Sequence, residues 1–270
     1  MNPDASTKYK CETKSFVYNL TSASGTKSIH MDKLITYALL LSQIRRIRAT
    51  RVRSYEFVVL MVAFFILATF VASGLTANFD KTISLHVRSL QGNERIDMAI
   101  IAITSFGDVT TLVVIGVILT VFRRTRKVGL IFLITIVFVA ITVMYFKPII
   151  GRQAPTYNFQ TSLHLPKYFA LEDDSVVPFA RGYSYPSNHV AVTTALAFIV
   201  GFAIEKKSRV LGILIWVLPV LIAFTKLYLM QHYVTDLIGG FLLGLIISIF
   251  MSNAMHLDQP FLMSRFKGKE

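Results

Sequence analysis

The chain has 270 residues, of which 54% are hydrophobic, and its mean hydropathy is +0.58. A soluble domain of this size is usually less apolar, so the composition favours a membrane protein. The net charge of +13 is divided among short clusters between apolar runs, which excludes an extended nucleic-acid-binding surface. Cys11 is the only cysteine, so an intramolecular disulfide bond is excluded as well.

Residues 1–54 form a polar and basic segment without the usual apolar core of a signal peptide at its start. From Met31 to Arg53 the segment mixes apolar residues with arginines, a pattern typical of an amphipathic helix on the inner leaflet. For residues 1–28, a solvated tail is an equally good interpretation. The role of this segment stays open.

Six apolar runs between residues 55 and 252 predict an all-α domain that crosses the membrane repeatedly. Several reach the roughly 20 residues that a spanning helix needs, and flanking neutral residues can lengthen the others. Buried helices of a large soluble protein are the alternative, but six such runs would leave almost no polar surface. The runs are 55–77, 109–122, 128–146, 190–204, 210–225 and 234–252. Residues 253–270 form a C-terminal tail.

The charges predict an orientation for these six spans. Lysine and arginine gather in four clusters, at 45–53, 123–127, 205–209 and 265–269. All four fall on one side, which the positive-inside rule makes cytoplasmic. We therefore expect a multi-pass protein of the cell membrane with both termini in the cytoplasm. The outer side then receives residues 78–108, 147–189 and 226–233.

Two of the outer segments have features of their own. Ile96 to Phe106 predicts an amphipathic helix at the outer interface. The loop 148–188 holds several prolines and the acidic run Glu172-Asp173-Asp174. Loops of this length in compact proteins are often functional, so it is either a cap over a substrate or a simple connector.

Three polar clusters lie at the outer ends of apolar runs. Lys147, Arg152 and Lys226 supply fixed positive charge, which could neutralise a phosphoryl group. Interfacial anchoring by long side chains is the alternative. In the second cluster, Ser187 is a favoured cap for the helix expected from about residue 190, and the free amides of a helix start can hold a phosphate. His189 would protonate a leaving oxygen there.

The third cluster contains His232 and Asp236, whose spacing of four places them on one face of a helix. A carboxylate on one imidazole nitrogen fixes the tautomer and leaves the other nitrogen free as a nucleophile. A purely structural pair is the alternative. No cysteine or histidine spacing typical of a metal site occurs, so neither a metal nor another cofactor is expected.

These three clusters resemble the signature of the type 2 phosphatidic acid phosphatase (PAP2) superfamily of membrane lipid phosphatases. The family's first motif, Lys, six residues and Arg-Pro, corresponds to Lys147–Pro155. Its second, Pro-Ser-Gly-His, corresponds to Pro186–His189. Its third, Ser-Arg, five residues, His, three residues and Asp, corresponds to Thr225–Asp236. The resemblance covers about residues 55–252 and implies a PAP2-type helical bundle.

The resemblance also implies a mechanism. His232 would attack phosphorus to form a phosphohistidine, Asp236 would orient it, and His189 would protonate the leaving group and then activate water. The phosphoryl oxygens would be held without a metal by the backbone amides of 187–189 and by Lys147, Lys226 and Ser187.

Three positions depart from the family pattern: Ala154 and Lys226 replace arginines, and Asn188 replaces a glycine. Lysine keeps the charge of arginine but loses its two-pronged contact. Arg152, two residues before Ala154, is expected to bind phosphate in its stead. The Asn188 amide is expected to donate to phosphate.

The expected function is hydrolysis of a lipid phosphate monoester or diphosphate at the outer face of the membrane. Candidate substrates are a polyprenyl diphosphate such as undecaprenyl diphosphate, phosphatidic acid and phosphatidylglycerophosphate. Two alternatives stay open: transfer of the phosphoryl group to another acceptor, and a non-catalytic lipid-phosphate binding or transport protein. The expected partners are the lipid substrate and the bilayer, with no nucleic acid.

Overall fold

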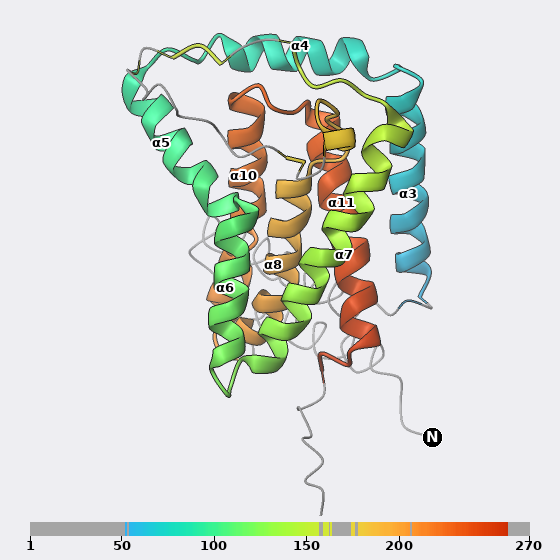
Figure 1. Ribbon diagram of the computed structural model, residues 1–270, viewed down its shortest axis with the longest axis vertical. Helices are drawn as coiled ribbons and strands as arrows, with labels where there is room; N and C mark the ends of the chain where they lie inside the picture. The colour runs from blue at the N-terminus through green and yellow to red at the C-terminus, as the bar shows by residue number, and fades with distance from the viewer. Residues whose placement is uncertain are drawn as a thin grey trace, which may run out of the picture. The chain divides into compact units, whose positions relative to one another are not determined.

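The computed structural model describes residues 52, 54–156, 159–161, 163, 174–175, 178–205 and 207–258. Most of the predicted N-terminal segment 1–54 and of the tail 253–270 therefore lies outside the described residues. The helices of the described part are α3 (Tyr55–Ala72), α4 (Ala77–Arg88), α5 (Glu94–Thr104), α6 (Val109–Val121), α7 (Arg126–Ile150), α8 (Asn188–Glu205), α9 (Arg209–Leu214), α10 (Val217–Tyr228) and α11 (Val234–Ala254) (Figure 1). Two short 3-10 helices, η1 (Ser105–Gly107) and η2 (Pro178–Ala180), complete the set.

The chain is a multi-pass membrane protein with an all-helical fold. Five helical segments are long and apolar enough to cross a bilayer: Tyr55–Ala72, Arg126–Ile150, Asn188–Glu205, Arg209–Tyr228 and Val234–Ala254. The predicted second span at 109–122 needs a correction, because α6 has 13 residues and reaches only about 20 Å. It attains spanning length only with the preceding segment Glu94–Gly107, from which it is bent by 48°.

Helix α8 forms the centre of the bundle (Figure 1). Its residues from Asn188 to Gly201 are all buried, and α6, α7, α10 and α11 pack against it. A helix that is apolar on every face is stable only when other helices surround it. Helix α3, by contrast, has only 17% of its residues buried and presents most of its apolar side chains outward. The start of α8 is therefore shielded by the helices around it.

Glycines let α11 approach α8 closely. A Cβ atom at Gly240 would lie 2.4 Å from the carbonyl oxygen of Ser187, and one at Gly244 would lie 2.4 Å from that of Ala191. Small residues four apart on one face are the usual means by which membrane helices pack backbone to backbone. The amide of Ser187 donates to the carbonyl of Asp236 at 3.1 Å. This contact joins the segment that enters α8 to the first turn of α11.

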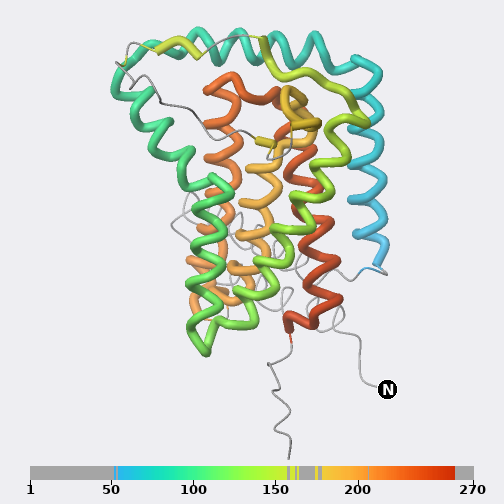
Figure 2. Tube along the Cα trace, in the orientation of Figure 1, coloured from blue at the N-terminus to red at the C-terminus, as the bar shows by residue number. Residues whose placement is uncertain are grey.

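Helix α4 lies across one end of the bundle (Figures 1 and 2). It is amphipathic, and its buried residues Asp80, Ser84 and Val87 follow a helical spacing that forms one inward face. The corner between α4 and α5 is fastened to the end of α10, because the Tyr228 hydroxyl donates to the carbonyl of Leu90 at 3.1 Å. The predicted interfacial helix at 96–106 corresponds to α5 and η1.

The chain after α7 turns back beside the segment that leads into α8. Gly151 ends α7 in the left-handed conformation, with φ of 69°, where glycine carries no steric penalty. The amide of Ala154 donates to the carbonyl of Gly182, and that of Ser184 to the carbonyl of Arg152, both at 2.9 Å. This short antiparallel contact places the end of α7 next to the start of α8.

Candidate active site

The predicted site residues gather at the end of the bundle that α4 covers. Lys147 belongs to the last turn of α7, His189 to the first turn of α8 and Lys226 to the last turn of α10. His232 lies in the turn between α10 and α11, and Asp236 in the first turn of α11. All five side chains are buried, with exposed fractions of 2% or less. Residues from three separate stretches of the sequence, at 147, at 189 and at 226–236, thus meet in a polar site inside an apolar bundle.

Asp174, from the predicted cap loop, forms the hub of this site. The amide of Asn188 donates to its two carboxylate oxygens at 3.1 and 2.9 Å, and the amide of His189 donates at 3.1 Å. The Lys147 ammonium lies 2.8 Å from the same carboxylate, and His189 Nδ1 lies 2.5 Å from it. His232 Nε2 approaches to 3.4 Å. A helix start, a lysine and two histidines therefore converge on one anion.

This environment shifts the pKa values of the two loop groups in opposite directions. Burial by itself raises the pKa of Asp174, but the charges of Lys147 and His232 and the histidine hydrogen bonds hold it well below its usual value. Burial by itself lowers the pKa of His232, but Asp174 and Asp236 favour the imidazolium and raise it above its usual value. The site is therefore strongly polarised, with Lys147 and the His232 imidazolium beside the ionised carboxylate of Asp174.

His232 stands between two carboxylates. Its Nδ1 lies 3.8 Å from Asp236 Oδ2, while its Nε2 faces Asp174. The two residues were predicted to share a helix face, but α11 begins only at Val234, so His232 precedes the helix. Asp236 instead folds back to accept from the amide of Tyr233 at 2.8 Å, and this capping contact turns its carboxylate toward the histidine.

Arg152 pairs with two carboxylates of the site. One terminal nitrogen donates to Asp236 at 2.8 Å, and the other donates to Asp80 of α4 at 2.6 Å. The guanidinium also lies 4.2 Å above the ring of Tyr233, and it donates to the Thr235 hydroxyl at 2.5 Å. Arg152 thus links Asp80 to Asp236, the carboxylate on the Nδ1 side of His232. Its predicted direct contact with phosphate stays a prediction.

Asp80 is a site residue that the sequence reasoning missed. It is fully buried, and besides Arg152 it accepts from the amide of Thr235 at 3.1 Å and from the Thr235 hydroxyl at 2.7 Å. The sequence contained one indication of this role: Asp80 is a charged residue on the inward-facing side of the amphipathic helix α4. Asp174 was noted only as part of the acidic run in the loop.

Several buried polar atoms at the start of α8 lack a hydrogen-bond partner among the described residues. They include the hydroxyl of Ser187 and the side-chain oxygen of Asn188. Buried polar groups are usually satisfied, so such a cluster points to a ligand that completes it. The groups that surround Asp174, the Lys147 ammonium and the amides of Asn188 and His189, can only donate, so the ligand expected at that position is an anion.

Comparison with known proteins agrees with this geometry. Residues 109–259 match the model of the PAP2 superfamily. The chain belongs to the PAP2 superfamily. It is similar to undecaprenyl-diphosphatase of Sulfolobus acidocaldarius, with 26% identity over 200 residues that cover 71% of this chain and 87% of that protein.

The PAP2 fold extends over most of the chain. A crystal structure of a transmembrane PAP2-type phosphatidylglycerolphosphate phosphatase from Bacillus subtilis superimposes with a TM-score of 0.61 at 22% identity. The match covers 77% of this chain and 100% of that one. The PAP2 family resemblance inferred from the three motifs is thereby confirmed, and the chain is in its general class a membrane lipid phosphatase.

Proposed function

We propose that this protein hydrolyses the phosphate monoester or diphosphate of a lipid through a phosphohistidine on His232. One observation carries the proposal. Lys147, the amides of Asn188 and His189 and the His189 ring surround a single anion position, and His232 Nε2 lies 3.4 Å from the carboxylate that occupies it. A phosphoryl group in that position would lie next to Nε2 of His232, while Asp236 orients the ring through Nδ1.

In the first step, Nε2 of neutral His232 attacks phosphorus, and the bond from phosphorus to the lipid oxygen breaks. For a diphosphate, the broken bond is the one to the bridging oxygen. His189 donates its proton to the departing oxygen, so the lipid leaves neutral or with one charge fewer. Asp236 stabilises the Nδ1 proton of His232 as positive charge develops on the ring. The product of this step is a phosphohistidine.

In the second step, His189 accepts a proton from water while the water oxygen attacks phosphorus. The phosphorus–nitrogen bond breaks, its electron pair returns to His232, and inorganic phosphate is released. The buried ammonium groups of Lys147 and Lys226 stabilise the charge of both transition states. Ser187 and the amides at the start of α8 supply neutral donors to the same oxygens.

Arg152 is assigned a positioning role in this scheme. It holds Asp236 at 2.8 Å, and its own second nitrogen is held by Asp80 at 2.6 Å. A chain of alternating charges thus extends from α4 to the nucleophile. This arrangement explains how the site functions with Ala154 where the family motif has an arginine: the nearby guanidinium orients the carboxylate partner of the nucleophile.

The substrate class follows from the relatives. One acts on undecaprenyl diphosphate and another on phosphatidylglycerolphosphate by name, so a polyprenyl diphosphate and a glycerophospholipid monophosphate are the leading candidates. Phosphatidic acid completes the panel. Transfer to an acceptor other than water uses the same intermediate, and it would appear as lipid consumed without an equal release of phosphate.

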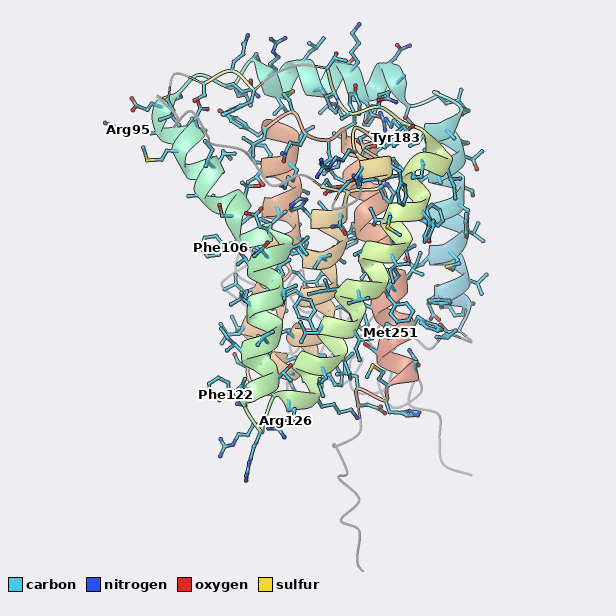
Figure 3. All side chains as sticks on the ribbon, in the orientation of Figure 1. Arg95, Phe106, Phe122, Arg126, Tyr183 and Met251 are labelled. Atoms are coloured by element: carbon cyan, nitrogen blue, oxygen red, sulfur yellow. The ribbon has the colours of Figure 1, made fainter. Side chains whose placement is uncertain are left out.

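We also propose that the site opens to the outer side of the cell membrane. Figure 3 places Arg126, which belongs to the basic cluster 123–127, at the end of the bundle opposite Tyr183. The strand-like contact of Tyr183 with Gln153 lies at the site end. The positive-inside rule then assigns the Arg126 end to the cytoplasm. A lipid phosphate substrate that cannot cross the membrane tests this orientation. It should be hydrolysed by sealed cells and not by sealed inverted vesicles.

The decisive test is release of inorganic phosphate by the purified full-length protein in detergent micelles. Undecaprenyl diphosphate, phosphatidic acid and phosphatidylglycerophosphate would be offered separately, with His232→Ala as the inactive control. Release from at least one lipid, and its loss in the control, supports the proposal. Tight binding of all three lipids without any release would instead favour a non-catalytic binding protein.

A further inference from the structure

Resting on the proposed function for the identity of the site, we propose that Asp174 is an internal ligand of the phosphoryl pocket, which the phosphate of the substrate displaces. The resting enzyme is then held closed by its own carboxylate. The sequence could not have indicated this, because Asp174 belongs to the long loop and not to any of the three motifs.

The contacts of Asp174 are those that a phosphate requires. Its carboxylate accepts from the amides of Asn188 and His189, the first N–H groups of α8. It also contacts the Lys147 ammonium and His189 Nδ1. The nucleophilic nitrogen of His232 lies 3.4 Å away. A phosphoryl group and this carboxylate cannot both use these donors, so binding of one excludes the other.

Electrostatics explains why the pocket is filled and why the filling is exchangeable. Lys147 is 1% exposed, and a buried ammonium without an adjacent anion is strongly destabilised. Asp174 supplies that anion in the absence of substrate. A phosphate monoester carries up to two negative charges and more acceptor oxygens than a carboxylate, so it forms stronger charge-assisted contacts with the same donors. Exchange therefore favours the substrate without leaving Lys147 unpaired.

A different role for Asp174 leads to different measurements. If Asp174 stayed in place to orient His189 during catalysis, its removal would lower kcat and leave phosphate binding unchanged. Displacement has the opposite signature. The apparent dissociation constant equals the intrinsic one divided by the fraction of open pocket. If the pocket is open for about a tenth of the time or less, removing Asp174 tightens phosphate binding about tenfold or more.

The experiment compares wild type with Asp174→Asn and Asp174→Glu, using the purified full-length protein. Inorganic phosphate binding is measured by calorimetry, and orthovanadate inhibition is measured with a lipid phosphate substrate. We expect Asp174→Asn to lower the dissociation constant of phosphate and the inhibition constant of orthovanadate about tenfold or more. KM for the lipid phosphate should fall in parallel. Asp174→Glu keeps the competing charge and should lie near wild type. Glu94→Gln removes the same charge from an exposed position of α5 and should change nothing.

Unchanged or weaker phosphate binding in Asp174→Asn would overturn the proposal. Binding does not require turnover, so tighter phosphate binding without hydrolysis of any lipid would sink the proposed function and leave this inference standing. Tighter inorganic phosphate binding with an unchanged KM would mean that free phosphate, and not the lipid headgroup, competes with Asp174.

Wild-type protein provides a measurement that does not depend on the folding of a variant. Hydrogen exchange at 174–175 should accelerate when vanadate binds, because the loop loses its carboxylate contacts. The amides of Asn188 and His189 should stay protected, because vanadate replaces the carboxylate. Exchange at 174–175 that slows or stays the same would contradict displacement.

Discussion

Arg152 and Asp80 form an ion pair of 2.6 Å between the segment after α7 and the helix that covers the end of the bundle. Asp80 is fully buried, and the Arg152 side chain is 12% exposed. The same guanidinium holds Asp236, the carboxylate behind the nucleophile. Through this pair, α4 takes part in the geometry of the active site even though it carries none of the family motifs.

Substitution of Asp80 tests this relay. Asp80→Asn leaves Arg152 with one carboxylate fewer, so Asp236 loses part of its support. Breaking a buried ion pair typically costs about 3–5 kcal/mol of folding stability, so thermal unfolding should be measured beside kinetics. We expect kcat to fall about tenfold or more with little change in KM, because Asp80 does not contact the substrate. Lys81→Ala, on the exposed face of the same helix, is the matched control. A parallel rise in KM would contradict a positioning role.

His232 is expected to be indispensable. His232→Ala removes the nucleophile and should lower kcat by about 10⁴ or more. His189→Ala should retain some phosphoenzyme but slow both its formation and its breakdown, because one group protonates the leaving oxygen and then activates water. Rapid-quench kinetics with radiolabelled lipid phosphate measures both steps. His86→Ala, on the exposed face of α4, serves as the control. Substantial turnover in His232→Ala would remove His232 from the mechanism.

The pH dependence follows from the raised pKa of His232. Attack requires the neutral ring, so kcat/KM should rise with pH through a value above the usual histidine pKa. Asp174 and Asp236 raise that pKa. Lys147, Arg152 and the His189 ring are the other groups that contact these carboxylates. Asp174→Asn removes a negative charge beside His232 and so lowers the pKa of that histidine. The acidic limb of the kcat/KM profile should therefore move to lower pH. A shift to higher pH would contradict the assignment of this limb to His232.

Metal independence and vanadate inhibition follow from the donor set. The anion position is lined by an ammonium group and by N–H donors, which repel a cation and bind a pentavalent oxyanion. Phosphate release should therefore persist after prolonged dialysis against a chelator, and orthovanadate should inhibit competitively. Restoration of activity only by an added divalent cation would count decisively against the phosphohistidine route.

The membrane architecture and the identity of the motif residues were predictable from the sequence, because both depend on local patterns. Apolar runs of spanning length identify their own helices, and the spacing from His232 to Asp236 places the two side chains within one turn of chain. Even here tertiary structure decided a detail. Helix α6 is too short to span alone, and it reaches spanning length only together with Glu94–Gly107, from which it is bent by 48°.

The partners of the buried charges were decided by tertiary structure. Arg152 and Asp80 are 72 residues apart in the sequence. Lys147 is 28 residues from Ser175, the neighbour of Asp174, and only the fold brings these groups together. A buried charge pairs with whichever opposite charge the packing brings within reach, and no periodic pattern in the chain encodes that choice. The sequence thus determined which groups could perform the chemistry. The packing of α4, α7, α8 and α11 determined that Arg152 supports Asp236 and that Asp174 fills the pocket.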